Sequence, residues 1–431
     1  MPQRTGEGAM KLHLKGGRVI DPSTRTDRVQ DVFIAAGSIA ALGMPPADFV
    51  ADRTFDVTGL AVMPGLVDLA ARRMTAASEA AAALAGGVTR VVCPPDTNPV
   101  LDAPDLVEML QLRARAVHHA QVHPLGALTV GLAGRELTEM AQLARAGCIG
   151  LSQANASITD NRTLLRAMQY AGTFGLTVWL RPQDAALAAG GVAASGAVAS
   201  RLGLAGIPVA AETIALHTIL ELVRVTGTRV HLCRLSSAAG LALVRSAKAE
   251  GLPVTCDVAA HHLHLSDMDI GYFDAQYRLD PPLRGQRDRE AIRDAARDGT
   301  VDAICSDHTP LAVDARLVPF AEAEPGASGV ELLLSLVLKW ADESRVPLVD
   351  ALARVTYGPG QRVATVAPGA GRLAPGQPAD LCVFAPSAHW TVSAQQMRSA
   401  GHNTPFLGYE VPGRVGLTLV GGHVAHETLA V

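Results

Sequence analysis

The middle of the chain alternates strand-length apolar runs with alanine- and leucine-rich stretches at helical spacing. We expect strands at 64–69, 88–93, 121–128, 147–151, 176–180, 229–235, 253–258 and 301–305. We expect helices at 137–146, 161–173, 212–226, 238–250 and 287–297. Eight strands that alternate with helices are typical of a (β/α)8 barrel, in which chemistry lies where the strands end. The residues just after each run are therefore the candidate site residues.

Both ends of the chain contain short apolar runs separated by turns, such as 18–22 near the start and 379–384 near the end. This pattern is typical of small antiparallel sheets. We therefore predict an α/β protein with a TIM-like barrel over 63–365. A small β-sandwich domain would be built from 1–62 and 366–431. The alanine-rich stretch 185–199 is expected to be a loop or a short helix.

Composition limits the class of protein. Of the 431 residues, 48% are hydrophobic and 18% are charged, which is typical of a globular chain with a large core. A net charge of -4 gives no reason to expect nucleic-acid binding. No apolar run reaches the roughly 18 residues that span a membrane, and the first ten residues, MPQRTGEGAM, lack the apolar centre of a signal peptide. We expect a cytoplasmic protein that does not bind membranes.

The six cysteines are expected to be buried structural thiols. Most lie within apolar runs, as in Val91-Val92-Cys93 and Leu381-Cys382-Val383, where free cysteine behaves as a small hydrophobic residue. No pair is arranged as CxxC, so a zinc knuckle or a redox pair is not expected.

A series of motifs occurs in one order along the chain. They are PPDTNP at 94–99, HHL at 261–263, DPPLR at 280–284, SDHTP at 306–310, PGASGVE at 325–331 and NTPFLGYE at 403–410. In this order the motifs resemble those of bacterial dihydroorotase, a member of the amidohydrolase superfamily. Hydantoinases share the barrel and the sandwich, but the NTPFLGYE segment favours dihydroorotase.

The resemblance implies six metal-ligand positions: two histidines after strand 1, a carboxylate after strand 4, histidines after strands 5 and 6, and an aspartate after strand 8. The matching residues here are Ala70, Arg72, Gln153, Arg181, Arg234 and Asp307. Alanine has no donor atom, and arginine stays protonated and offers no lone pair. Zinc requires imidazole, thiolate or carboxylate ligands. We therefore expect no metal and no other cofactor at these positions.

Positions that the resemblance assigns to substrate binding also differ. Met74 replaces an arginine, and Asp96 and Asp280 replace asparagines, so two carboxylates lie where an anionic substrate would bind. Like charges disfavour that binding. The segment from Ala70 to the Gly86-Gly87 pair is about seven residues shorter than the family pattern.

Asp307 has two interpretations. It could act as a catalytic base, but we favour an ion pair with one or more of Arg72, Arg181 and Arg234, since a buried carboxylate without a metal needs a cation. His261, His262 and His308 are the candidates for a residual site. Two histidines alone rarely bind metal tightly, so we expect structural roles for them.

These features predict a chain that is not an enzyme. Within the family that it resembles, such degenerate members associate with the catalytic chain of aspartate carbamoyltransferase in pyrimidine biosynthesis, typically as six plus six chains. The expected role is that of a structural or regulatory subunit, a pseudoenzyme. One alternative is an active amidohydrolase of dihydroorotase or hydantoinase type, with an atypical site built on Asp307, His308 and the arginines. The other is a module that senses an anion through its arginines.

Overall fold

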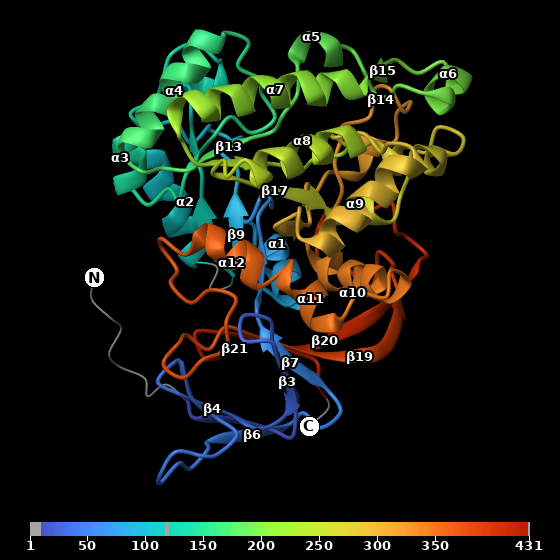
Figure 1. Cartoon of the computed structure of the whole chain (residues 1–431). Helices are drawn as coiled ribbons and strands as arrows, with labels where there is room; N and C mark the ends of the chain where they lie inside the picture. Colours follow the sequence, from blue (N-terminus) through green and yellow to red (C-terminus); the bar gives the residue numbers. More distant parts are fainter. Residues whose placement is uncertain (1–9, 117–119, 430–431) are drawn as a thin grey trace.

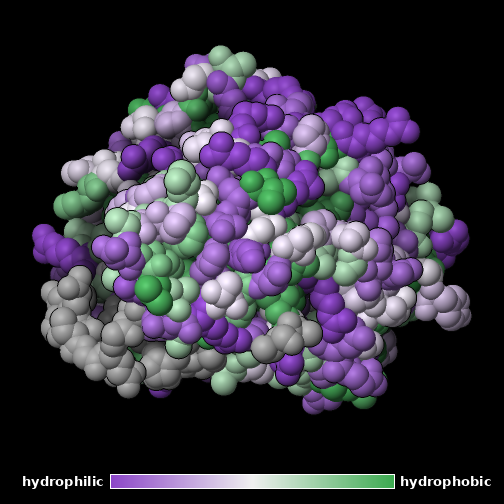
Figure 2. All heavy atoms as spheres, turned by 90° about the horizontal axis from the view of Figure 1, so that it is seen from below, coloured by the Kyte–Doolittle hydropathy of each residue, from purple (hydrophilic) through white to green (hydrophobic). Residues whose placement is uncertain are grey.

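The computed structural model describes residues 10–116 and 120–429. Figure 1 shows a strand-rich part at the bottom and a larger part above it, in which helices surround central strands. Figure 2 views the molecule from below, and hydrophilic side chains cover most of that face, with hydrophobic ones in small groups. Within the described ranges, no helix is long and apolar enough to cross a membrane.

Two sheets form the strand-rich part. The first has the order β5-β4-β1-β6 and comprises β1 (Leu12–Lys15), β4 (Val32–Ala35), β5 (Ser38–Leu42) and β6 (Arg53–Asp56). The second has the order β21-β20-β19-β7-β2-β3 and comprises β2 (Arg18–Asp21), β3 (Thr26–Val29), β7 (Ala61–Pro64), β19 (Leu381–Thr391), β20 (Glu410–Val420) and β21 (His423–Glu427). In this second sheet, β19 lies antiparallel to β7, with Val383 opposite Val62. Strands from both ends of the chain therefore pair directly.

The two sheets bury one shared apolar cluster. Leu14 and Val32 from the first sheet pack with Val19, Leu381 and Leu417 from the second. The domain boundaries at 62/63 and 365/366 stay predictions, and residues 1–9 and 430–431 of the predicted sandwich lie outside the described residues.

The upper part contains parallel strands where the sequence predicts them. One sheet has the order β10-β9-β8 and comprises β8 (Leu66–Asp68), β9 (Val88–Cys93) and β10 (Gln121–Pro124). The other follows the chain order from β11 to β18 and comprises β11 (Gly126–Ala127), β12 (Leu151–Ser152), β13 (Val178–Leu180), β16 (Val230–Leu232), β17 (Val254–Ala259) and β18 (Ala303–Cys305). Every pair within these two sheets is parallel. The α/β class is thus confirmed.

The two parallel sheets meet at β10 and β11 and, through the segment 354–355, at β18 and β8. Hydrogen bonds at both places favour closure of the sheets into the predicted barrel. Only Leu125 separates β10 from β11, and its N–H donates to the carbonyl of Cys93 in β9 at 2.9 Å. At the other end, the segment 354–355 lies between β18 and β8. The N–H of Ile304 donates to the Arg354 carbonyl at 2.8 Å, and the N–H of Val67 donates to the Val355 carbonyl at 2.9 Å.

The helices lie outside the strands. The described α-helices are α1 (Ala77–Ala85), α2 (Pro104–Ala116), α3 (Met140–Arg145), α4 (Asn161–Thr173), α5 (Ala185–Ala188), α6 (Ala197–Leu202), α7 (Val209–Thr226), α8 (Ala238–Ala249), α9 (Gln286–Asp298), α10 (Leu333–Glu343), α11 (Leu348–Ala353) and α12 (Tyr357–Val363). The five helices expected from the sequence are present as α3, α4, α7, α8 and α9. The side chain of Asp160 caps α4, and that of Ser237 caps α8. Gly227 ends α7 with a φ of 64°, a conformation that glycine adopts without strain. These local signals explain why the helix boundaries follow the sequence pattern.

The alanine-rich stretch contains α5 and α6 with a short strand pair, β14 (Ala193–Ala194) and β15 (Gly206–Ile207). All six cysteines are free, and five are buried, while Cys233 is half-buried. Burial raises the pKa of the Cys148 thiol to about 12, as expected for an inert structural cysteine.

Candidate functional site

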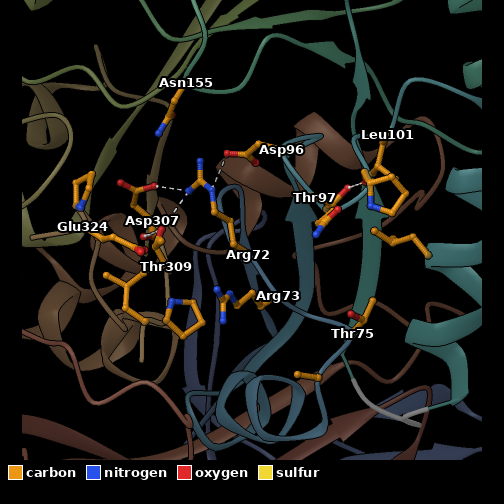
Figure 3. A pocket seen from close by; sticks show the side chains of 18 of the residues that line it. Arg72, Arg73, Thr75, Asp96, Thr97, Leu101, Asn155, Asp307, Thr309 and Glu324 are labelled. Atoms are coloured by element: carbon orange, nitrogen blue, oxygen red, sulfur yellow. Dashed lines mark hydrogen bonds and ion pairs between the residues drawn. The ribbon is translucent and has the colours of Figure 1, made fainter. Parts of the chain in front are cut away.

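A cavity of about 700 Å³ lies beyond the carboxyl ends of the parallel strands. We call it the mouth cavity, and Figure 3 shows it from close by. Its lining residues are Arg72, Arg73, Thr75, Ala76, Asp96, Thr97, Asn98, Pro99, Leu101, Leu106, Met109, Leu110, Arg113, Asn155, Arg234, Asp280, Asp307, Thr309, Pro310, Leu311, Glu324, Pro325 and Gly326. Three of the residues predicted from the sequence, Arg72, Arg234 and Asp307, thus face one space.

Asp307 lies between two arginines from other strands. Its Oδ1 accepts hydrogen bonds from Nη1 of Arg234 at 2.9 Å and from Nη1 of Arg72 at 3.2 Å. The Asp307 and Arg234 side chains are 7% and 4% exposed, so little water competes for these ion pairs. Asp307 follows β18 with a φ of 47°, a left-handed backbone that aims the carboxylate across the strand ends. The carboxylate therefore ties β18 to β8 and β16.

Arg234 keeps its charge despite burial. Burial alone would lower its pKa, but the neighbouring Asp307 carboxylate outweighs this and raises the pKa above its usual value. Its Nη2 donates to Oδ1 of Asn155 at 2.6 Å. A fixed cation therefore lies at the floor of the mouth cavity.

Two nitrogens of the Arg72 guanidinium, Nε and Nη1, donate hydrogen bonds, and the third, Nη2, donates none to the residues that the structure describes. Its Nε donates to Oδ2 of Asp96 at 3.0 Å, and its Nη1 also donates to Oγ1 of Thr309 at 3.2 Å. Figure 3 shows Arg72 between Asp96 and Asp307. Among the described residues, Nη2 of Arg72 and Oδ1 of Asp96 have no hydrogen-bond partner. Both atoms are themselves buried, while the Arg72 and Asp96 side chains as a whole are 13% and 26% exposed and line the mouth cavity.

The remaining sequence candidates lie elsewhere. Arg181 pairs with Asp280, with 2.5 Å between its Nη1 and Oδ2, so among the three predicted partners of Asp307 it is Arg72 and Arg234 that contact the carboxylate. Asp280, which the resemblance assigned to a substrate-binding position, follows η4 (Ala275–Tyr277) and lines the mouth cavity. Gln153 is buried, and its Nε2 donates to Thr129 and to a backbone carbonyl. Ala70 packs in an apolar cluster.

The family's metal positions do not fit a metal ion. Ala70 offers no donor, and the amide of Gln153 is used within the chain. Arg72 and Arg234 place two guanidinium groups on the carboxylate that would be the sixth ligand. Protonated guanidinium offers no lone pair and repels a dication. The chemistry of this cavity is therefore derived below from its own side chains.

Three other side chains that could bind a metal lie close together, and the sequence pattern did not predict this cluster. Ligand atoms of His231, Cys233 and Asp257 all lie within 4.8 Å of one another. Nε2 of His231 is 2.9 Å from Oδ2 of Asp257, and its Nδ1 is 2.8 Å from Oγ1 of Thr255. A metal would have to replace the contact between His231 and Asp257. The signal for Asp257 is an aspartate inside the apolar strand VTCDVA.

The three candidate histidines do not line the mouth cavity. His308 points to the opposite side from Asp307, and its Nε2 is 2.9 Å from Oε2 of Glu79 in α1. Burial lowers the pKa of both His261 and His262 to about 3, so both are neutral at pH 7. Nε2 of His261 and Nδ1 of His262 have no partner within the described part of the chain. The alternative site that combines His308 with Asp307 is therefore wrong in its histidine.

The Glu79–His308 contact predicts a change of stability with pH. Burial would raise the pKa of Glu79, but hydrogen bonds with His308 and Ser399 outweigh it and lower the pKa to about 2 from 4.5. The stabilisation is therefore complete above about pH 4.5 and is lost as the pH falls toward 2. We expect Glu79→Gln to reduce this acid-induced loss, measured as the free energy of unfolding in urea across that range. An equal loss in the variant would contradict the assignment, and Glu290→Gln, at an exposed carboxylate, serves as control.

Comparisons with known proteins show which family this chain is similar to. A family model described as "Dihydro-orotase-like" matches residues 59–239. A "Dihydroorotase-like protein" of Pseudomonas aeruginosa is 46% identical, over 97% of this chain and 100% of that protein. A "Dihydroorotase" of Geobacter metallireducens is 35% identical, over 97% of this chain and 100% of that protein. The solved L-hydantoinase of Arthrobacter aurescens has a TM-score of 0.85 at 24% identity, covering 97% and 96% of the two chains, which is a likeness of fold.

These findings correct one prediction from the sequence. The expectation that the chain is not an enzyme is wrong, because relatives 35% and 37% identical over nearly their whole length are named dihydroorotase, which is an enzyme. The group of His231, Cys233 and Asp257 also shows that ligand-type side chains still meet in this structure. Five of the six predicted ligand positions have lost the family's ligand, but other side chains that can bind a metal or transfer a proton remain.

Proposed function

We propose that this chain, which belongs to the dihydroorotase-like family of amidohydrolases, hydrolyses a cyclic amide or ureide in the mouth cavity. The observation that carries the proposal is the mouth cavity beyond the strand ends, which is lined by the charged side chains of Arg72, Asp96, Arg234 and Asp307. The edge of a cyclic amide presents a carbonyl acceptor beside an N–H donor. The guanidinium of Arg72 offers donors and the carboxylate of Asp96 offers acceptors to such an edge, and both side chains line the cavity.

The side chains of the cavity supply the parts of an amide hydrolysis. Water adds to the carbonyl carbon, Asp96 takes a proton from that water, the ring C–N bond breaks, and the proton passes to the leaving nitrogen. The guanidinium groups of Arg72 and Arg234 stabilise the negative charge that develops on the carbonyl oxygen. Asp307 accepts a hydrogen bond from both arginines and is a positioning residue.

Turnover by the full chain tests this proposal. We expect ring opening of dihydroorotate, hydantoin or dihydrouracil, followed by chromatography of the product. Because the family's metal positions lack donors, we expect the rate to survive dialysis against a chelator. Absence of turnover on all three rings would overturn the proposal. Activity lost with the chelator and restored by zinc, but not in Cys233→Ser, would move the chemistry to His231, Cys233 and Asp257.

We also propose that the chain associates in the cytoplasm with the catalytic chain of aspartate carbamoyltransferase, as six plus six chains. There it would act as a structural or regulatory subunit beside its own site. The motif resemblance supports this partner. Co-purification with a tagged copy, followed by a mass measurement, tests it. A tagged chain that never retains the carbamoyltransferase would refute this association.

A further inference from the structure

The mouth cavity has a polar end and an apolar end. Figure 3 shows Asp307 and Asn155 on one side of Arg72, and Leu101 and Thr97 on the other. The apolar end is formed by the loop before α2 and by α2 itself: Pro99, Leu101, Leu106, Met109 and Leu110 all line the cavity. No catalytic group of the proposed function belongs to this end.

One face of α2 contributes three apolar side chains to the cavity. Leu106, Met109 and Leu110 are spaced i, i+3 and i+4, so their side chains lie on the same face of the helix. Leu110 is 6% exposed, while Leu106 and Met109 are half-buried and present their free area to the cavity. Leu112, on another face, is 65% exposed and does not line the cavity. Within α2, Leu106, Met109 and Leu110 therefore line the cavity, and the charged Arg113 lines it one turn further along the helix.

The volume of the cavity exceeds what a small ring fills. Sites of about 300–1,000 Å³ bury most of a drug-sized ligand, and the mouth cavity has about 700 Å³. A single cyclic ureide at Arg72 and Asp96 would leave the side chains of α2 facing water. Apolar surface left in water is unfavourable, and a ligand that covers it gains affinity.

We propose that the ligand carries an apolar arm of several carbons, which lies against Leu106, Met109 and Leu110 while its cyclic amide lies at Arg72 and Asp96. The choice of a cyclic amide rests on the proposed function. The inference of an apolar arm is based only on the apolar face of α2. The substrate class is accordingly a cyclic amide or ureide with an alkyl or aromatic substituent.

A homologous series of ligands tests the arm. Hydantoins with 5-methyl, 5-propyl and 5-pentyl substituents are titrated into the full chain by calorimetry, and their ring opening is measured separately. We expect the dissociation constant to fall about fourfold per methylene, since each buried methylene contributes about 0.8 kcal/mol. Met109→Glu and Leu106→Gln should each flatten this dependence, whereas Leu112→Glu should leave it unchanged.

The outcomes separate this inference from the proposed function. A dissociation constant that does not change along the series overturns the arm, as does a dependence that survives both cavity variants or the absence of binding by every member. Binding that tightens along the series without ring opening supports the arm and refutes the hydrolytic function. Ring opening without chain-length dependence supports the hydrolytic function and refutes the arm.

Discussion

Replacing Asp307 with alanine is expected to lower the free energy of unfolding by about 3–5 kcal/mol. The change removes the carboxylate that pairs with Arg72 and Arg234, so that Arg234 loses its counter-charge while Arg72 keeps only Asp96. Since the Asp307 and Arg234 side chains are only 7% and 4% exposed, water replaces the lost interaction poorly. Urea unfolding followed by circular dichroism measures the effect.

An exposed ion pair gives the matched control. Asp294 pairs with Arg297 on the surface of α9, where the side chains are 62% and 54% exposed. Asp294→Ala should cost less than about 1 kcal/mol, because solvent screens such pairs. If the two variants lost the same stability, Asp307 would not be a buried counter-charge. Asp307→Asn, which keeps the shape of the side chain, should still lose most of the stability, since it removes the negative charge.

Asp96→Asn is expected to reduce the turnover of a cyclic amide by roughly 10²–10⁴-fold, the range that a positioned general base contributes. The amide of asparagine cannot take a proton from water, although it can still accept a hydrogen bond from Nε of Arg72. The variant should therefore fold normally and bind the ring, so that kcat falls much more than KM changes. Single-substrate kinetics and a thermal melt of the same sample measure both properties.

A carboxylate nearby but outside the cavity gives the comparison. Asp105 lies in the first turn of α2 and does not line the mouth cavity. Asp105→Asn should retain the kinetics of the parent chain. A loss in Asp96→Asn no greater than in Asp105→Asn would remove Asp96 from the reaction and leave the arginines as binding groups only.

Pattern and spacing predicted the strands and helices because each element has a clear period and recognisable ends. The same pattern predicted that Asp307 meets Arg72 and Arg234, since all three follow parallel strands whose carboxyl ends lie together. Arg181 also follows such a strand, yet its partner is Asp280 from an irregular segment. Which carboxylate lies nearest depends on a loop path, and no periodicity in the sequence encodes that path.

The histidines show a second limit of prediction from the sequence. Asp307 and His308 are adjacent, so a motif such as SDHTP suggests that they act together. The backbone at Asp307 is left-handed, and His308 contacts Glu79 of α1 and does not line the mouth cavity. Asp257 was missed for a related reason, because the strand around it is almost entirely apolar and its partner His231 lies on the neighbouring strand.

The antiparallel pairing of β7 with β19 has a consequence for synthesis on the ribosome. β7 ends at Pro64 and β19 begins at Leu381. One edge of β7 therefore stays unpaired while the ribosome synthesises the residues between these two strands. An unpaired strand edge of this kind can pair with other chains. The nascent protein can therefore complete this sheet only after β19 has been synthesised, and a truncated product lacking β19 would leave β7 open to aggregation.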